Sequence, residues 1–157
     1  MCGIVGYTGL NAVAPILLQG LEKLEYRGYD SAGVGLIREN SIEITRASGK
    51  LSNLAAKFQN ESSEPGTGIG HTRWATHGPP TSENAHPHQD PSGRVAIVHN
   101  GIVENWRELR AEFASGKFTS DTDSEVLAHI IAAFLTEGES LISAVRRTLS
   151  EATGAFS

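Results

Sequence analysis

The residue with the clearest potential for chemistry in this chain of 157 residues is its single cysteine, Cys2. Taken alone, a cysteine is more often an inert apolar residue than a nucleophile. Removal of Met1 would give Cys2 both a thiol and a free α-amine, and the reference pKa of an α-amine is about 7.7–8.0. That amine can take the thiol proton near neutral pH and later pass it to a leaving group. The position therefore suggests an N-terminal nucleophile, and the alternative is an ordinary start to an edge strand.

A second cluster of chemically capable residues spans residues 71–78, HTRWATHG, at the end of an expected strand. The guanidinium of Arg73 is a planar fork that matches a carboxylate, and nearby hydroxyls and backbone amides could complete such a site. The alternative for Arg73 is a surface ion pair. Trp74 is by default a core aromatic residue, but it could also cover a small binding site.

Asn100 and Gly101 have two interpretations. An Asn-Gly pair favours positive φ and a tight turn of the hairpin type. Alternatively, the Asn100 amide and the Gly101 N–H could donate to the oxygen that becomes negative when a nucleophile attacks an amide carbonyl. Asp123 is likewise either the acidic residue favoured in the first turn of a helix or a carboxylate that holds an ammonium group.

The histidines raise the question of a metal site, because five of the six lie between His71 and His99. The sequence His86-Pro87-His88 does not have the helical i, i+4 spacing, and neither an H-E-x-x-H motif nor a paired-cysteine motif is present. The glycines do not form a G-x-x-x-x-G-K-[ST] phosphate loop either. We therefore expect neither a metal nor a cofactor.

The overall composition is that of a globular protein, with 39% apolar and 20% charged residues. The formal net charge of −5 and the scattered basic residues argue against a nucleic-acid partner. No apolar run approaches the ~20 residues that span a bilayer, and no basic signal segment opens the chain. A single cysteine cannot form an intrachain disulfide. Together these features predict a cytoplasmic protein that does not bind membranes.

The first part of the chain must place Cys2 on a rigid element. Residues 3–7 form a strand-like apolar run, and Asn11 is expected to cap a helix whose apolar face carries Val13, Leu17, Leu21 and Leu24. Pro15 falls in the first turn of that helix, where a missing N–H costs little. Residues 32–37 and 42–46 are expected to form a hairpin, and a short helix is expected over residues 51–58.

The second part must place residues 73, 100 and 123. A strand is expected over residues 67–71, then a proline- and histidine-rich loop over 77–93, long enough to suggest function, and a buried strand over 95–99. Ile102, Trp106, Leu109 and Phe113 share one helical face. Residues 122–125, TDSE, form a capping-box signature before a helix over 126–135. A further helix is expected over 141–149, and residues 154–157 resemble the start of a strand. This mixture predicts an α+β or layered α/β fold in one domain.

Five ordered blocks of the sequence resemble the glutaminase domain of the glutamine–fructose-6-phosphate aminotransferase family. They are residues 1–6 (MCGIVG), 24–33 (LEYRGYDSAG), 71–78 (HTRWATHG), 84–88 (NAHPH) and 98–101 (VHNG). The Cys-Gly and Asn-Gly pairs recur across the class II glutamine amidotransferases. Residues 26–30 and 73–77 are the blocks that resemble the fructose-6-phosphate branch.

The resemblance covers residues 1–157 and implies an α+β fold, the four-layer αββα sandwich of the N-terminal-nucleophile hydrolases. Glutaminase domains of this family continue well beyond residue 157. The resemblance therefore implies a partial glutaminase domain, truncated on its C-terminal side, with the sugar-phosphate isomerase domain absent.

Roles follow from the resemblance position by position. Cys2 is similar to the nucleophile that forms a glutamyl thioester, its amine to the base, and Asn100 with Gly101 to the oxyanion hole. The remaining matched positions resemble substrate-binding positions of the family: Arg73, Thr76 and His77 those that hold the α-carboxylate of glutamine, Asp123 the one that holds its α-ammonium group, and Trp74 a residue of the loop that closes over it. Arg27 is similar to a residue near the active site.

The implied activity is hydrolysis of glutamine to glutamate and ammonia. In the intact enzyme, expected to be a homo-oligomer, the ammonia converts fructose 6-phosphate to glucosamine 6-phosphate, and fructose 6-phosphate binds only through the missing domain. One alternative is a class II amidotransferase with another acceptor, such as an enzyme of purine or asparagine synthesis. A second alternative is a catalytically inactive interaction module with a glutaminase-like surface.

Overall fold

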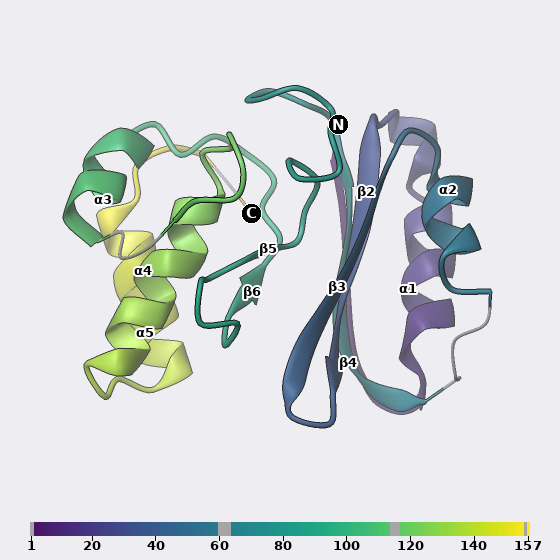
Figure 1. Ribbon diagram of the computed structural model, residues 1–157, viewed down its shortest axis with the longest axis horizontal. Helices are drawn as coiled ribbons and strands as arrows, with labels where there is room; N and C mark the ends of the chain where they lie inside the picture. Colours follow the sequence, from purple (N-terminus) through teal and green to yellow (C-terminus); the bar gives the residue numbers. More distant parts are fainter. Residues whose placement is uncertain (1, 60–63, 114–116, 156) are drawn as a thin grey trace.

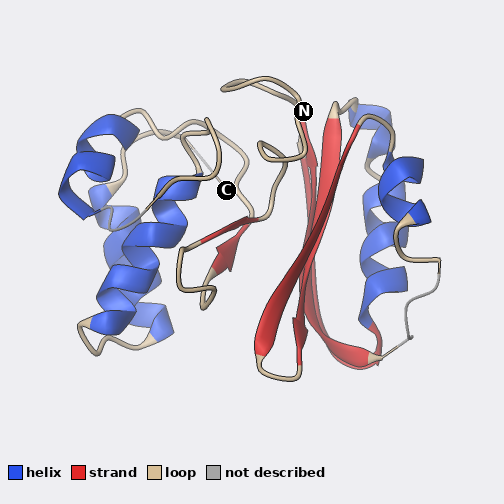
Figure 2. Cartoon of the chain, in the orientation of Figure 1, coloured by secondary structure: helices blue, strands red, loops and turns tan. Residues whose placement is uncertain are grey.

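The computed structural model describes residues 2–59, 64–113, 117–155 and 157. The elements are β1 (Gly3–Ala12), α1 (Val13–Glu22), the 3₁₀ turn η1 (Glu25–Arg27), β2 (Ser31–Arg38), β3 (Ser41–Ser48), α2 (Leu51–Ala56), β4 (Pro65–Arg73), β5 (His88–Gln89), β6 (Ala96–Ile97), α3 (Trp106–Phe113), α4 (Glu125–Thr136) and α5 (Leu141–Glu151). They stack as helices, sheet, sheet and helices (Figures 1 and 2). The α+β class and the αββα layering expected from the sequence are confirmed.

The larger sheet has four antiparallel strands in the order β1-β4-β2-β3. Gly3 of β1 pairs with Thr72 of β4, and Arg73 of β4 pairs with Ser31 of β2. Because these strands alternate in direction, the residue before β1, the end of β4 and the start of β2 meet at one end of the sheet. Cys2 and Arg73 are therefore neighbours, although 71 positions separate them in the sequence.

Helix α1 covers the outer face of this sheet. Its buried residues Val13, Leu17 and Leu21 recur with the helical period that the sequence predicts, and they share a core with Val34 and Leu36 of β2. The expected cap at Asn11 is wrong, because β1 continues to Ala12 and no side chain caps α1. Leu24 lies beyond the end of α1. Pro15 does fall in the first turn, as expected.

The hairpin β2–β3 and helix α2 confirm the hairpin and the short helix expected over residues 32–58. Their ends differ from the expected ends by no more than two residues. The strand expected over 67–71 is longer, because β4 begins at Pro65 and ends at Arg73.

A second core joins α3, α4 and α5 to the smaller sheet. Val126, Ile130 and Phe134 of α4 are at most 1% exposed, so this helix forms the centre of that core. The expected capping box is wrong. Ser124 is the N-cap without a side-chain cap bond, the Thr122 hydroxyl bonds Nε2 of His88, and the Glu125 carboxylate accepts from Thr119 and Ser120. Tertiary partners have displaced the local bonds.

Among the described residues the smaller sheet consists of β5 and β6, and the strand expected over 95–99 is shorter than predicted, because β6 spans Ala96–Ile97. Asn100 does not form a hairpin turn. Its backbone N–H and C=O both pair with Ser157, at 2.9 Å each. The strand start expected over residues 154–157 thus has ladder bonds at Ser157, whereas Phe156 lies outside the described residues.

We define the sheet half as β1–β4 with α1 and α2, the helical half as residues 95–157, and the bridging segment as residues 74–94. The bridging segment crosses between the halves (Figure 1). It lies directly on β2, because a Cβ atom at Gly33 would be only 2.1 Å from the His86 carbonyl oxygen. Gly33 is therefore required for this close approach.

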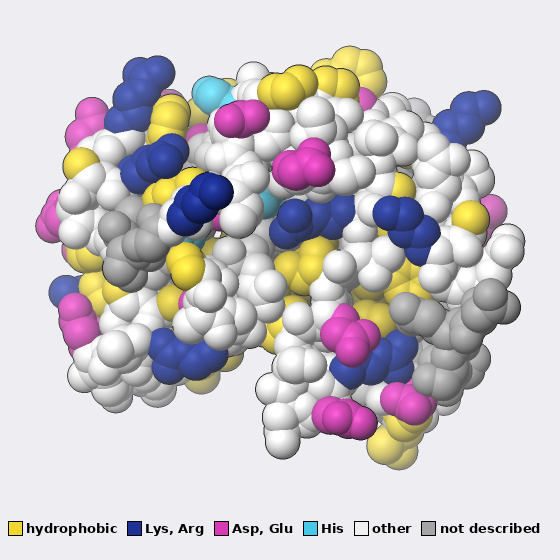
Figure 3. All heavy atoms as spheres, in the orientation of Figure 1, with side chains coloured by type: hydrophobic (Ala, Val, Ile, Leu, Met, Phe, Trp, Pro, Cys, Tyr) yellow, Lys and Arg dark blue, Asp and Glu magenta, His cyan; other side chains and the backbone are white. Residues whose placement is uncertain are grey.

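On the face shown in Figure 3, acidic and basic side chains are interspersed, without a large patch of one sign. Within the described residues, no helix has the length and apolar character needed to cross a bilayer.

Candidate active site

A cavity of about 350 Å³ opens where the end of the larger sheet meets the helical half. Its lining includes the eight residues to which the sequence analysis gave a catalytic or substrate-binding role: Cys2, Arg73, Trp74, Thr76, His77, Asn100, Gly101 and Asp123. Arg27, expected near the active site, belongs to η1 and does not line this cavity. This volume lies at the lower end of the range for small-molecule sites. Four separate segments of the chain thus converge on one space of the size of a small metabolite.

Cys2 is half-buried at the start of β1. Its Sγ accepts a hydrogen bond from the Trp74 N–H at 3.2 Å and lies 3.8 Å from the Trp74 carbonyl oxygen. The next residue is held as well, because the Gly3 N–H donates to Oγ1 of Thr72 at 3.0 Å. These bonds fix the position of the sulfur at the start of β1, at the edge of the cavity.

Asp30 is a residue that the sequence analysis missed. Its carboxylate accepts from the Ala75 N–H and from the Ser31 hydroxyl, and its own N–H donates to the Arg73 carbonyl at 2.8 Å. These bonds fix the peptide groups on both sides of Trp74, and Trp74 contacts the thiol. The sequence signal that could have identified Asp30 was its place in the block 24–33, directly before β2, which begins at the site.

Arg73 is only 4% exposed. Nη1 donates to the Pro79 carbonyl at 3.2 Å, and Nη2 donates to the carbonyls of His77 and Gly78. Burial lowers the pKa of this guanidinium, while Asp30, Cys2 and Asp123 act in the opposite direction. Arg73 therefore secures the loop over residues 77–79, and it also supplies positive charge to the cavity.

Trp74 is 55% exposed at the cavity, so the core alternative for this residue is wrong. Its ring packs on Gly28, where a Cβ atom would lie 2.9 Å from a ring carbon. Gly28 also has φ +75°, a conformation that side chains disfavour. Thr76, two residues after Trp74 in the sequence, is exposed and also lines the cavity.

Asp123 is only 3% exposed, and its carboxylate faces both the cavity and the backbone. Oδ2 accepts from the Val103 N–H at 2.7 Å, and Oδ1 lies 3.4 Å from the Ser124 hydroxyl and 3.9 Å from Nδ1 of His77. The residue precedes α4 but makes no cap bond, so the first-turn interpretation does not describe its contacts. An anion thus lies in the same cavity as the Arg73 cation.

Asn100 and Gly101 follow β6 on the opposite side of the cavity from the larger sheet. The backbone of Asn100 is paired with Ser157, and among the described residues its side-chain amide has no hydrogen-bond partner. Gly101 has φ +150°. Asn100, which has a side-chain amide, and Gly101, which has a backbone N–H, therefore line the same cavity as Cys2, as an oxyanion hole requires.

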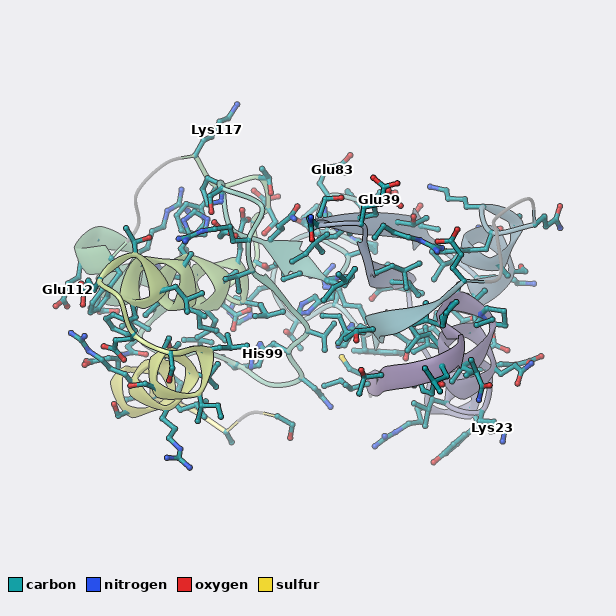
Figure 4. All side chains as sticks on the ribbon, turned by 90° about the horizontal axis from the view of Figure 1, so that it is seen from below. Lys23, Glu39, Glu83, His99, Glu112 and Lys117 are labelled. Carbon is teal, nitrogen blue, oxygen red and sulfur yellow. The ribbon has the colours of Figure 1, made fainter. Side chains whose placement is uncertain are left out.

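Four histidines, His71, His86, His88 and His99, gather between the two halves. The His86 ring stacks on His71 with centroids 4.3 Å apart and contacts His88 edge-on at 4.4 Å. His99 lies between the helical half and the larger sheet (Figure 4), and its Nδ1 is 2.7 Å from Oγ of Ser124. Burial is the main cause that lowers the pKa of His71 and of His88 to about 3. These imidazoles are neutral near pH 7.

The described residues contain no group of three or more His, Cys, Asp or Glu side chains arranged to hold a metal ion. What the cavity does contain is a thiol, two potential oxyanion donors, a cation and an anion. A thiol with oxyanion donors suits acyl transfer, and a cation beside an anion suits the zwitterionic end of an amino acid.

The αββα layering, with a cysteine at the start of the first strand of the larger sheet, defines an N-terminal-nucleophile domain. The family model described as "Glutamine amidotransferase domain" matches residues 34–147. The chain belongs to this glutamine amidotransferase family.

Curated relatives agree with this assignment. The glutamine–fructose-6-phosphate aminotransferases (isomerizing) of Gloeobacter violaceus and Aquifex aeolicus are 52% and 51% identical over 99% of this chain. The chain spans only 26% of the length of each.

Solved structures show the same fold. Glutamine phosphoribosylpyrophosphate amidotransferase from B. subtilis is 26% identical, with a TM-score of 0.74 over 99% of this chain and 34% of its own. A structure described as the allosteric regulatory enzyme of purine biosynthesis is also 26% identical, with a TM-score of 0.81 over the same shares.

Proposed function

We propose that this chain hydrolyses the side-chain amide of glutamine to glutamate and ammonia, with Cys2 as the nucleophile. The observation that supports this proposal most is the single cavity lined by all eight residues that the sequence predicted. Membership in the glutamine amidotransferase family supplies the substrate class.

The reaction has two stages. The Cys2 sulfur adds to the amide carbon of glutamine, the C–N bond breaks, ammonia leaves and a thioester remains. A water molecule then adds to the thioester, the thiol is released and glutamate leaves. The base is the Cys2 α-amine after removal of Met1, and it passes the thiol proton to the departing nitrogen. Met1 itself lies outside the described residues.

The two charges in the cavity orient the substrate. Arg73 binds the α-carboxylate of glutamine together with Thr76 and His77, and Asp123 binds the α-ammonium group. Asn100 and Gly101 donate to the amide oxygen, which becomes negative during attack. Trp74, which is exposed at the cavity and packed on Gly28, covers the bound glutamine.

In the whole protein we propose that residues 1–157 are part of the glutaminase domain. A sugar-phosphate isomerase domain outside them binds fructose 6-phosphate and uses the ammonia to form glucosamine 6-phosphate, in a cytoplasmic homo-oligomer. The identity of 52% to an aminotransferase of this kind supports this acceptor. The solved glutamine phosphoribosylpyrophosphate amidotransferase, whose name indicates another acceptor, shares the fold but is only 26% identical.

The test is glutamate release from glutamine by the wild-type protein, by Cys2→Ala and by Ser41→Ala. Ser41 begins β3 and does not line the cavity, so its substitution is the matched control. We expect release by the wild type and the control and none by Cys2→Ala. An inactive wild type would instead support the interaction-module alternative. Glutamate release by Cys2→Ala would show that Cys2 is not the nucleophile.

A further inference from the structure

His86 makes contacts with both halves of the molecule. It belongs to the bridging segment, its carbonyl oxygen lies directly over Gly33 of β2, and its ring stacks on His71 of β4 with centroids 4.3 Å apart and an interplanar angle of 20°. The imidazole is thus fixed to the sheet that carries Arg73 at the end of β4 and Gly3, the neighbour of Cys2, at the start of β1.

The residues next to His86 are also held in place by hydrogen bonds and packing. The Arg46 Nε–H donates to the Pro87 carbonyl at 2.9 Å, and Pro87 packs over Gly35 of β2. On the other side, Asn84 exchanges hydrogen bonds with Asp121, whose N–H donates to the Asn84 side chain at 2.8 Å. The imidazole therefore projects from a segment that has little freedom to shift.

From this position, Nδ1 of His86 accepts the backbone N–H of His99 at 3.1 Å in a buried environment. His99 directly precedes Asn100, whose own N–H and C=O are both used by Ser157. The His99 side chain is held by Ser124, which neighbours Asp123. The His86 bond is thus a direct tie from the sheet of the nucleophile to the peptide that leads into the oxyanion donors.

We infer that His86 is a positioning residue, which sets the distance between Cys2 and the oxyanion donors Asn100 and Gly101 by accepting the His99 N–H. This inference rests on the proposed glutaminase function. An acceptor Nδ1 carries no proton, so the ring must be the neutral tautomer with its proton on Nε2.

The surroundings of His86 keep the ring neutral. Burial is the main cause that lowers its pKa, and the other titratable groups facing it are His71 and Arg73 of β4, His88 of its own segment and His99. All of these act in the same direction. The ring can therefore accept the His99 N–H throughout the neutral pH range.

The decisive comparison, made in the full-length protein, uses His86→Phe and His86→Asn. Phenylalanine keeps an aromatic ring on His71 but has no acceptor, whereas the asparagine Oδ1 occupies nearly the place of Nδ1. We expect His86→Phe to lower kcat about 10- to 100-fold, since small misplacements of catalytic groups cost this much. The KM for glutamine and the alkylation rate of Cys2 should change less than about threefold. His86→Asn should recover most of kcat.

His129→Asn is the matched control, because His129 is a buried imidazole stacked on Phe118 and does not line the cavity. It should lower stability without a comparable loss of kcat. A double-mutant cycle with Asn100→Ala tests the route of action. If His86 works through the oxyanion donors, His86→Phe should cost little once Asn100 is alanine. Fully additive losses, or wild-type kcat in His86→Phe, would overturn the inference.

A measurement on the wild type guards against variants that fail to fold. Nitrogen NMR of the labelled protein should show His86 at neutral pH with an unprotonated Nδ1, and the His99 amide should exchange slowly with solvent. A proton on Nδ1 would overturn the inference. The protonation of Nδ1 and the exchange rate of the His99 amide can both be measured without turnover. A protein that releases no glutamate would therefore contradict the proposed function, but not the contact between His86 and His99.

Discussion

The Trp74 N–H donates a hydrogen bond to Sγ of Cys2 at 3.2 Å. This contact depends on groups that do not touch the thiol themselves. Asp30 holds the flanking peptides, and Thr72 holds the amide of Gly3. At the scale of single residues, the site is therefore a set of cavity-lining groups kept in place by hydrogen bonds that sequence motifs do not display.

Arg73→Lys should raise the KM for glutamine at least about tenfold, because an ammonium group cannot reproduce a planar fork. The structure adds a second cause, since the same guanidinium holds the carbonyls of residues 77–79. Steady-state kinetics with glutamine provides the measurement. As a control, the rate at which a small reagent alkylates Cys2 should stay near that of the wild type. An unchanged KM would show that Arg73 does not bind the substrate.

Asn100→Ala should lower kcat about 10²–10³-fold, equivalent to ~2.7–4 kcal/mol of barrier, with a much smaller change in KM. The oxyanion exists only along the reaction path, and the amide of Asn100 has no other partner among the described residues. Asn105→Ala is a suitable control, because Asn105 bonds Glu151 and Thr153 away from the cavity. A loss confined to KM would contradict the assigned role.

At the scale of elements, the sequence predicts those parts of the fold that local patterns determine. Alternation and turn residues located the β2–β3 hairpin, and apolar spacing located α1, α4 and α5. The errors occur where a tertiary partner replaces a local one. Thr122 and Glu125 match a capping box, but His88 and residues 119–120 use their polar groups instead. Asn100 matches a turn residue, but Ser157 pairs with it.

The expected site residues came from the resemblance to family motifs, whereas the residues that support them do not lie in a recognisable local pattern. Nothing in the local sequence places His86 against His99, since 13 positions and two strands separate them. The same applies to Asp30 and Ala75, which are 45 positions apart. Such contacts depend on the antiparallel register of β2 and β4 and on the path of the bridging segment.

Gly33→Ala tests whether the bridging segment packs directly on β2 at Gly33. A new Cβ atom would lie 2.1 Å from the His86 carbonyl oxygen, so the backbone must move, at a cost of about 1–3 kcal/mol of unfolding free energy or more. Gly6→Ala is the matched control, since its Cβ would meet no atom within 4 Å. Urea unfolding measures both variants. Equal stability of the two would show that the segment is not seated on Gly33.

At the scale of the whole molecule, two cores are joined through a buried histidine cluster. One core lies between α1, α2 and the larger sheet, and the other surrounds α4. The cavity opens at the junction, so its geometry depends on how the halves are held together. The cluster contributes stacking and hydrogen bonds there only while its imidazoles are neutral.

Stability should therefore fall in mild acid. The pKa values of His71 and His88 are lowered from 6.5 to about 3, so the unfolded chain binds protons at these residues from about pH 6.5 downward, before the folded protein does. The unfolding free energy should decrease as pH falls from about 6.5 to about 3. Glu125, whose pKa is lowered to about 2, adds a loss below about pH 4.5. Urea midpoints that stay constant between pH 7 and pH 4.5 would contradict this.

The central claim is that Cys2, freed of Met1, forms a covalent intermediate with glutamine. The most direct measurement is mass spectrometry of the N-terminal peptide after the protein has been mixed with glutamine and quenched in acid within one turnover. We predict a peptide that begins at Cys2 and carries the mass of glutamine less ammonia on that residue. Glutamate formation with Met1 retained, or without any adduct on Cys2, would contradict the account.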